Sequence, residues 1–209
     1  MKIIDNYRDL PFGVYLEICE IDKREDIEEL HKQVRIISIL SGMAENDIYN
    51  LPIDEYKELA MKMSFLSKPY DGEVLIAKSY TIGRWQLIPT QDFRKITTAQ
   101  YIDFQTFAAE GEKRIIEILS TMLVPKGKKY NQDYDVMELQ QCLREYLSVA
   151  DALSLFAFFF VQFNLLIKDS LTYSKQQVMS LKDKEKKEIL LKRIQQTEDL
   201  LRDGVGLPM

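Results

Sequence analysis

The sequence has little of what most catalytic metal centres are built from. Its 209 residues include one histidine, His31, and two cysteines, Cys19 and Cys142. A di-iron bundle needs two Glu-x-x-His units, and zinc hydrolases generally use two or more imidazole ligands, so a single histidine argues against both classes. His31 lies between Leu30 and Lys32 on the expected outer face of a helix, and we interpret it as a solvated side chain.

The two cysteines lie far apart in the chain, and each is placed among apolar residues at helical spacing. We expect two buried free thiols, as in a reducing cytosol, rather than a disulfide or a metal pair. The first ten residues include Asp5, Arg8 and Asp9, so we expect no secretory signal there. The protein is therefore expected to remain inside the cell.

Glycine and proline are scarce, with 8 and 6 residues, while apolar residues make up 46% and charged residues 29%. This balance excludes collagen-like, low-complexity and wholly disordered chains and favours a helical globular protein. The longest apolar run, Ala152 to Ile167, has Ser154, Gln162 and Asn164 within it. It is shorter than the roughly 20 residues of a membrane-spanning helix, so we expect a helix buried on all sides and no membrane.

Basic residues are outnumbered by acidic ones, since the chain has 28 Lys and Arg against 33 Asp and Glu and a net charge of −5. Residues 1–66 are the most acidic block, with 8 basic and 14 acidic side chains. Residues 175–209 have 8 basic and 6 acidic side chains. No block approaches the basic stripe of a nucleic-acid-binding protein, so nucleic acid is not expected to be the main ligand.

Apolar residues at helical spacing predict the secondary structure. The expected helices cover 11–20, 24–40, a stretch behind Pro52 to about 66, 97–122, 136–147, 152–167 with an extension to about 181, and 190–201. A single turn is expected over 44–49, a left-handed helix cap at Gly42, and a bend or split at Gly111. β-branched and aromatic residues over 70–89, with Gly72 and Gly83 as breakers, predict a small β-hairpin or meander.

These elements predict a mainly α fold, a bundle of about seven helices with one small β-hairpin insertion. We divide the chain into an N-terminal helical lobe over 1–66, a hairpin spacer over 67–96 and a C-terminal helical lobe over 97–209. The pattern leaves open whether the two lobes share a core. Residues 204–209 are expected to form a loose tail.

Two groups of residues have side chains that could support chemistry. Asp103, Glu110 and Glu117 recur every seven residues and would lie on one helix face, where they could hold a divalent cation or act as an acid/base pair. A water-facing acidic stripe is the simpler interpretation. The basic loop from Val124 to Tyr130 lacks the first glycine and the Ser/Thr of a phosphate-binding loop. We therefore predict no catalytic, metal-binding or cofactor-binding residues and no enzyme activity.

Two groups are candidates for binding a protein partner. Arg84 and Trp85 have the composition of a binding hot spot, although an aromatic side chain in a hairpin can equally pack onto the helices. Leu190, Ile194 and Leu201 form a narrow apolar seam on the last expected helix. This seam could pair with a helix of a partner or dock on the protein's own bundle.

One resemblance adds to this interpretation. The residues that carry it are Ile36 to Met43, Asn46 to Pro52, Tyr56 to Leu59, and Phe65-Leu66. Together they resemble the N-terminal pattern of bacteriophage tail assembly chaperones, in which a helix ending in Leu-Ser-Gly is followed by an acidic turn, Leu-Pro and a second helix. Ile96 to Phe104 is similar to the helix opening that follows the hairpin in such proteins. The resemblance covers about half of the chain and omits 175–209 and the apolar segment Phe156 to Phe163.

The resemblance implies a non-enzymatic protein of the host bacterial cytoplasm, of phage or prophage origin. Such a protein binds the helical tape measure protein, keeps it soluble and helps recruit tail tube subunits. It implies a protein partner and no cofactor, and transfers no functional residue. The alternative is a structural connector or ring subunit that forms homo-oligomers and is retained in the virion. A small enzyme is the third hypothesis.

Overall fold

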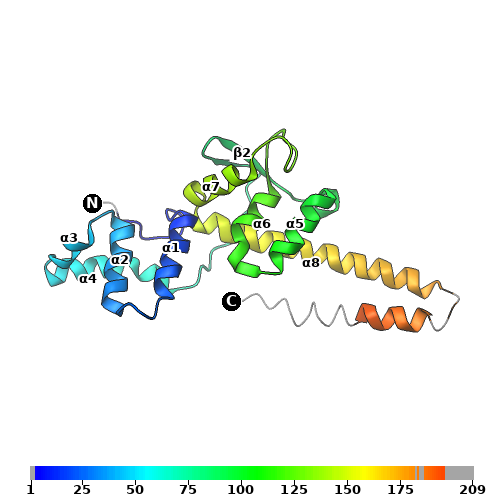
Figure 1. Cartoon of the computed structure of the whole chain (residues 1–209), viewed down its shortest axis with the longest axis horizontal. Helices are drawn as coiled ribbons and strands as arrows, with labels where there is room; N and C mark the ends of the chain where they lie inside the picture. The colour runs from blue at the N-terminus through cyan, green and yellow to red at the C-terminus, as the bar shows by residue number, and fades with distance from the viewer. Residues whose placement is uncertain (1–2, 182, 184–185, 196–209) are drawn as a thin grey trace. The chain divides into compact units, whose positions relative to one another are not determined.

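A computed structural model of the chain describes residues 3–181, 183 and 186–195, leaving out the side chain of Glu112. The protein is mainly α-helical with one small antiparallel sheet, as the sequence predicts (Figure 1). The chain divides into two compact units. Unit 1 comprises residues 1–90 and 96–158, and unit 2 comprises 91–95 and 159–209. Unit 1 thus holds all of residues 1–66 together with the hairpin.

The N-terminal part of unit 1 is a series of short helices. They are α1 (Phe12–Asp22), α2 (Glu29–Ser41), α3 (Glu45–Tyr49), α4 (Ile53–Lys62) and the 3-10 turn η1 (Met63–Ser67). Gly42 follows α2 with a φ of 71°, and its N–H donates to the carbonyl of Ser38, so the left-handed cap is confirmed. The predicted start of α2 at Arg24 is wrong. Arg24 instead donates two hydrogen bonds to Asp26 in a turn before the helix, at 3.0 and 2.6 Å.

The sheet has three strands, one more than the expected hairpin. They are β1 (Tyr80–Ile82), β2 (Trp85–Pro89) and β3 (Leu123–Pro125), in the order β1-β2-β3. Both pairs are antiparallel, with Leu87 opposite Tyr80 on one side and opposite Pro125 on the other. Residues 68–79 form no helix or strand, so the hairpin starts about ten residues later than predicted.

The expected helix over 97–122 is divided, as the position of Gly111 suggested. It forms α5 (Thr98–Ala108), the 3-10 turn η3 (Gly111–Arg114) and α6 (Ile115–Met122), and Gly111 has a φ of 65°. α6 is buried along nearly its whole length, so it lies at the centre of the core of unit 1. α7 (Val136–Tyr146) follows, and Asp135 caps its start by accepting hydrogen bonds from the N–H groups of Met137 and Glu138.

The long apolar helix is α8 (Val149–Met179), whose first ten residues belong to unit 1 and the rest to unit 2. The predicted extension of this helix beyond Ile167 is confirmed, but the prediction that the helix is buried on all sides is wrong. Val161 is 51% exposed and Leu165 49% exposed, while Phe159 and Phe163 are buried. Among the described residues, α8 is the one helix long and apolar enough to cross a membrane, and 39% of its most apolar window is buried. Such a helix alone is weak evidence, because core helices of soluble proteins meet the same condition.

Unit 2 also contains the 3-10 turn η2 (Phe93–Lys95) and a helix over 186–195. The ring of Phe93 packs against the rings of Phe159 and Phe163, at centroid distances of 6.3 and 6.4 Å. After α8, the side chain of Lys187 donates a hydrogen bond to the carbonyl of Met179. The seam residues Leu190 and Ile194 lie in the second helix, whereas Leu201 and the expected tail over 204–209 lie outside the described residues.

Candidate protein-binding surfaces

Arg84 and Trp85 lie at the turn between β1 and β2, and their side chains differ in exposure. The Arg84 guanidinium lies 4.7 Å from the centroid of the Trp85 ring and pairs with the carboxylate of Glu138 on α7. The half-buried Trp85 ring lies 6.1 Å from the ring of Tyr134. The indole is thus packed against the protein, and Arg84 is the more exposed residue of the pair.

The hairpin turn runs along one face of α7. A Cβ atom added at Gly83 would lie 3.6 Å from the Cys142 sulfur and 3.5 Å from the Tyr146 ring. Glu138, Cys142 and Tyr146 are four residues apart and therefore face the turn together. Cys142 and Cys19 are both free thiols but half-buried, so the expectation of full burial is wrong.

Met137 and Tyr146 are large exposed side chains of α7, and Tyr146 lies beside this turn. Sequence reasoning did not single them out. The available signal was the amphipathic pattern of α7, in which Leu139 and Leu143 form the buried face and Met137 falls outside it.

Burial also raises the pKa of the Tyr134 phenol, whose ring lies beside Trp85, to about 12, so Tyr134 stays neutral at physiological pH.

In the apolar seam, Leu190 and Ile194 are half-buried within unit 2. Ile189, which the seam did not include, is the more exposed residue. Lys186 and Lys192 are exposed on the same helix. This helix therefore presents an aliphatic side chain between cationic ones.

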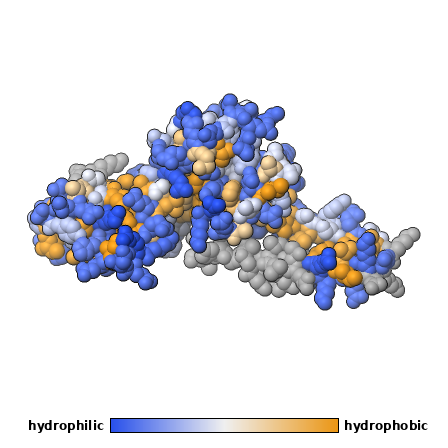
Figure 2. All heavy atoms as spheres, in the orientation of Figure 1, coloured by the Kyte–Doolittle hydropathy of each residue, from blue (hydrophilic) through white to orange (hydrophobic). Residues whose placement is uncertain are grey.

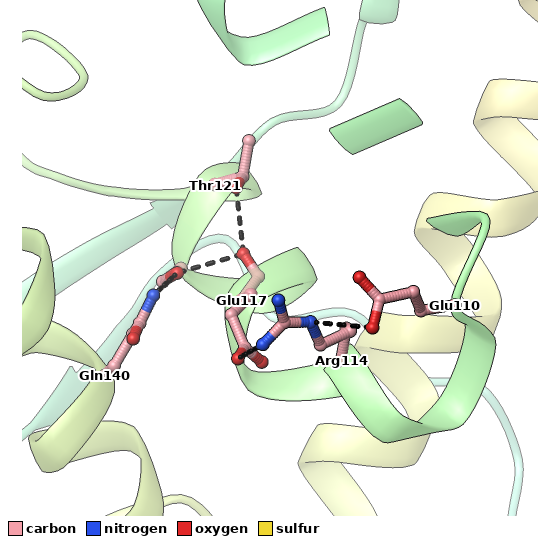
Figure 3. A network of polar contacts seen from close by, with 6 residues as sticks. Glu110, Arg114, Glu117, Thr121 and Gln140 are labelled. Atoms are coloured by element: carbon pink, nitrogen blue, oxygen red, sulfur yellow. Dashed lines mark hydrogen bonds and ion pairs between the residues drawn. The ribbon is translucent and has the colours of Figure 1, made fainter. Parts of the chain in front are cut away.

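The expected acidic stripe does not exist as a single helix face, because the chain turns at Gly111. Glu110 and Glu117 instead lie on either side of Arg114 (Figure 3). The Arg114 Nε atom lies 3.3 Å from Glu110 Oε2, and Nη1 donates to Glu117 Oε1 at 2.9 Å. The guanidinium thus neutralises both carboxylates, which is an arrangement for structure rather than for proton transfer.

The same network continues through the backbone of α6 (Figure 3). The hydroxyls of Thr121 and Ser120 donate to the carbonyl oxygen of Glu117 at 2.8 and 2.9 Å, and the Gln140 amide donates to Ser120 Oγ at 3.1 Å. Gln140 belongs to α7, so this chain of hydrogen bonds joins α6 to α7. Buried polar groups that are paired in this way specify how the two helices pack.

Asp103, the third residue of the expected stripe, lies apart from the other two. Its Oδ2 atom accepts a hydrogen bond of 2.8 Å from the hydroxyl of Tyr130, which lies 3.4 Å from Thr121 Oγ1. Burial, with Asp103 adding to it, raises the pKa of Tyr130 to about 12. This contact holds the loop before α7 against α5. Within the described residues, no group of three or more His, Cys, Asp and Glu side chains could hold a metal ion.

His31 is exposed on α2, as expected. Its Nδ1 atom lies 3.6 Å from Glu28 Oε2, and its ring lies 5.9 Å from the ring of Tyr49 on α3. Both contacts are with surface residues. His31 therefore lies at the surface, where α2 meets α3.

Exposed hydrophobic side chains gather in two further places. On α8 within unit 2 they include Val161 and Leu165, and on the N-terminal helices of unit 1 they include Tyr49, Ile53 and Met61. Figure 2 shows hydrophobic side chains among hydrophilic ones on both parts of the surface. Exposed apolar side chains rimmed by polar ones are typical of protein-binding surfaces.

No protein-family model, curated protein or solved structure matches the chain.

Proposed function

We propose that this protein is a non-enzymatic assembly protein that binds a helical partner through the exposed face of α8. The observation that carries the proposal is the exposure of Val161 and Leu165 on a helix whose Phe159 and Phe163 side chains are buried. Full burial of an aliphatic side chain is worth about 1.5–3 kcal/mol, so covering the exposed half of each would contribute about 1 kcal/mol.

The partner that suits this face is another helix. Val161 and Leu165 are four residues apart and lie one above the other on α8, which matches the spacing of helix-in-groove contacts. Gln162 and Asn164 flank them and supply a polar rim. A partner helix with its own apolar stripe would cover the aliphatic pair and leave the rim in water.

The resemblance to tail assembly chaperones gives this activity a context. In that context the protein works in the host bacterial cytoplasm, keeps the long helical tape measure protein soluble and leaves before the particle is complete. The structure supports a protein-binding role only through the exposed face of α8. The phage context rests on the residues of α2, α3 and α4 that carry the resemblance.

The test is an affinity pull-down from the native host after prophage induction, together with the composition of purified particles. The tagged wild-type chain is compared with the double variant Val161→Glu, Leu165→Glu. The matched control is Thr172→Glu, Gln176→Glu, which adds the same charge at exposed polar positions of α8. Circular dichroism establishes that all three chains fold.

We expect the wild-type chain and the control to capture a long helical tail protein, and the double variant to lose it. Absence of the chain from particles would then support a chaperone. Presence in particles at fixed copy number would instead make it a structural subunit. Capture of no tail protein, or equal capture by the double variant, would overturn the proposal.

A further inference from the structure

The two units of the chain carry opposite net charge. Unit 1 has 17 Lys and Arg against 25 Asp and Glu, whereas unit 2 has 11 against 8. Opposite charges on two surfaces steer them together and favour one orientation of contact. The net charges of the two units are therefore complementary.

On unit 1, negative charge gathers on the short helices α3 and α4. The exposed carboxylates there, Glu45, Asp47, Asp54, Glu55 and Glu58, outnumber the exposed Lys57 and Lys62 of α4, and Lys57 Nζ lies 3.7 Å from Asp54 Oδ1. The same helices expose aliphatic side chains, since Ile53 is 63% exposed and Met61 66% exposed. These two residues are eight positions apart and lie about 80° from each other around α4, with Lys57 between them and Glu58 three residues before Met61. We call this the acidic surface.

On unit 2, the described helix over 186–195 has the opposite character. Lys186 and Lys192 are exposed, and each is three residues from Ile189, which is 52% exposed. Side chains three apart are neighbours on a helix surface, so the two ammonium groups flank the aliphatic side chain. We call this the basic helix.

We propose that the protein assembles with copies of itself head to tail, the basic helix of one copy docking on the acidic surface of the next. The net charges of the two surfaces are complementary, and each offers an exposed apolar side chain beside its charges, Ile189 on the basic helix and Met61 next to Glu58 on the acidic surface. The two surfaces differ, so the contact is heterologous and each added copy leaves one of each kind open. Such a contact closes into a ring or extends as a filament. The inference is independent of the exposed face of α8.

The test is the mass of the purified full chain, measured by sedimentation over a range of concentrations at about 0.05 M and about 0.5 M salt. We expect the mass to rise with concentration above the 24.5 kDa of one chain, and to rise less at high salt. Two charge-reversal variants locate the contact. One carries Lys186→Glu and Lys192→Glu, and the other carries Glu55→Lys and Glu58→Lys.

Each reversal alone places like charges opposite each other and is expected to weaken assembly by about tenfold or more. Both reversals in one chain restore opposite charges and are expected to restore assembly, and so is mixing the two single-surface variants. The control is Asp71→Lys with Glu73→Lys, which makes the same change of charge in the exposed segment before β1 and is expected to leave the mass unchanged.

Three results would overturn the proposal. The first is a wild-type chain that stays at the mass of one copy at every concentration, including the case in which the basic helix docks on its own chain. The second is equal dissociation by the Asp71 and Glu73 control. The third is failure of the combined reversals to restore assembly although circular dichroism shows a folded chain.

Discussion

Gln100 joins the start of α5 to the end of α6, and replacing it tests how the core of unit 1 is held together. It is 6% exposed. Its Nε2 atom donates to the carbonyl of Thr121 at 3.0 Å, and its Oε1 atom accepts from the backbone N–H of Thr97 at 3.1 Å. The Thr97 hydroxyl in turn accepts from the Gln100 N–H, which completes a capping box.

The change Gln100→Leu nearly keeps the size of the side chain and removes its three hydrogen bonds, one to the carbonyl of Thr121 and two from the N–H and the hydroxyl of Thr97. The buried Thr121 carbonyl is left unpaired, which costs about 2 kcal/mol, whereas water replaces the bonds from the exposed Thr97 at a cost of about 0.5 kcal/mol in total. The added apolar surface returns about 1 kcal/mol. The backbone half of the capping box survives. We therefore expect a net loss of about 1–2 kcal/mol, which for a chain of this length lowers the melting temperature by about 2–8 °C.

Thermal and urea unfolding followed by circular dichroism measure this loss. Gln105→Leu is the matched control, because Gln105 is an exposed residue of the same helix. It makes the same chemical change and is expected to alter stability by less than about 0.5 kcal/mol. Equal effects of the two substitutions, or a more stable Gln100 variant, would show that the tie between α5 and α6 contributes nothing.

Three other substitutions or conditions are informative. Gly42→Ala meets no atom within 4 Å but forces a side chain onto a φ of 71°, so urea unfolding is expected to show a loss of about 1 kcal/mol. The folded-state pKa values of Tyr130 and Tyr134 are raised from 10.0 to about 12, so folding favours the neutral phenols. Their contribution to the free energy of unfolding is therefore fully present below pH 10 and is lost as pH rises toward 12. Tyr130→Phe should reduce that fall, and a flat profile of melting temperature against pH in the wild type would contradict it. Phe159→Asp places a charge at a fully buried position, so soluble expression is expected to be lost, and a folded soluble variant would disprove that role of Phe159.

The parts of the fold that the sequence predicts well are those decided by neighbouring residues. Gly42 and Gly111 both adopt a positive φ, at the two positions where the apolar spacing was interrupted. α5 and α7 begin within one residue of their predicted starts, where the side chains of Thr97 and Asp135 cap them. Each of these signals acts within one helical turn, so no knowledge of distant contacts is needed to interpret it.

The parts that the sequence predicts poorly depend on distant contacts. Leu123 to Pro125 looked like a helix end, and it is a strand only because β2 offers it a partner edge. Residues 70–79 look strand-like but form no strand, and the start of this stretch is held by Tyr7 of the N-terminal part. The Tyr7 hydroxyl donates to the carbonyl of Lys68, and the Tyr7 and Tyr70 rings meet at 5.8 Å.

The candidate site shows the same limit. Arg84 and Trp85 were found from composition, yet whether the indole is exposed was decided by Tyr134 and Glu138, which lie far along the chain. The grouping of Asp103, Glu110 and Glu117 failed because a seven-residue spacing gives one face only along an unbroken helix, and the helix splits at Gly111, where a bend or split was expected. One residue in the left-handed region was enough to turn a regular spacing into two separate contacts.

The length of the exposed face on α8 limits the kind of partner contact that it can make. Val161 and Leu165 are four residues apart, or about 6 Å along the helix axis, and charged residues follow at Lys168 and Asp169. A coiled coil needs an apolar seam over several heptads, which this face lacks. A helix crossing at a steep angle needs only such a short contact. Each copy would therefore bind a long helical partner weakly and at one place. Many copies bound along the partner would be needed to cover its length, and a chain that assembles with itself can supply those copies.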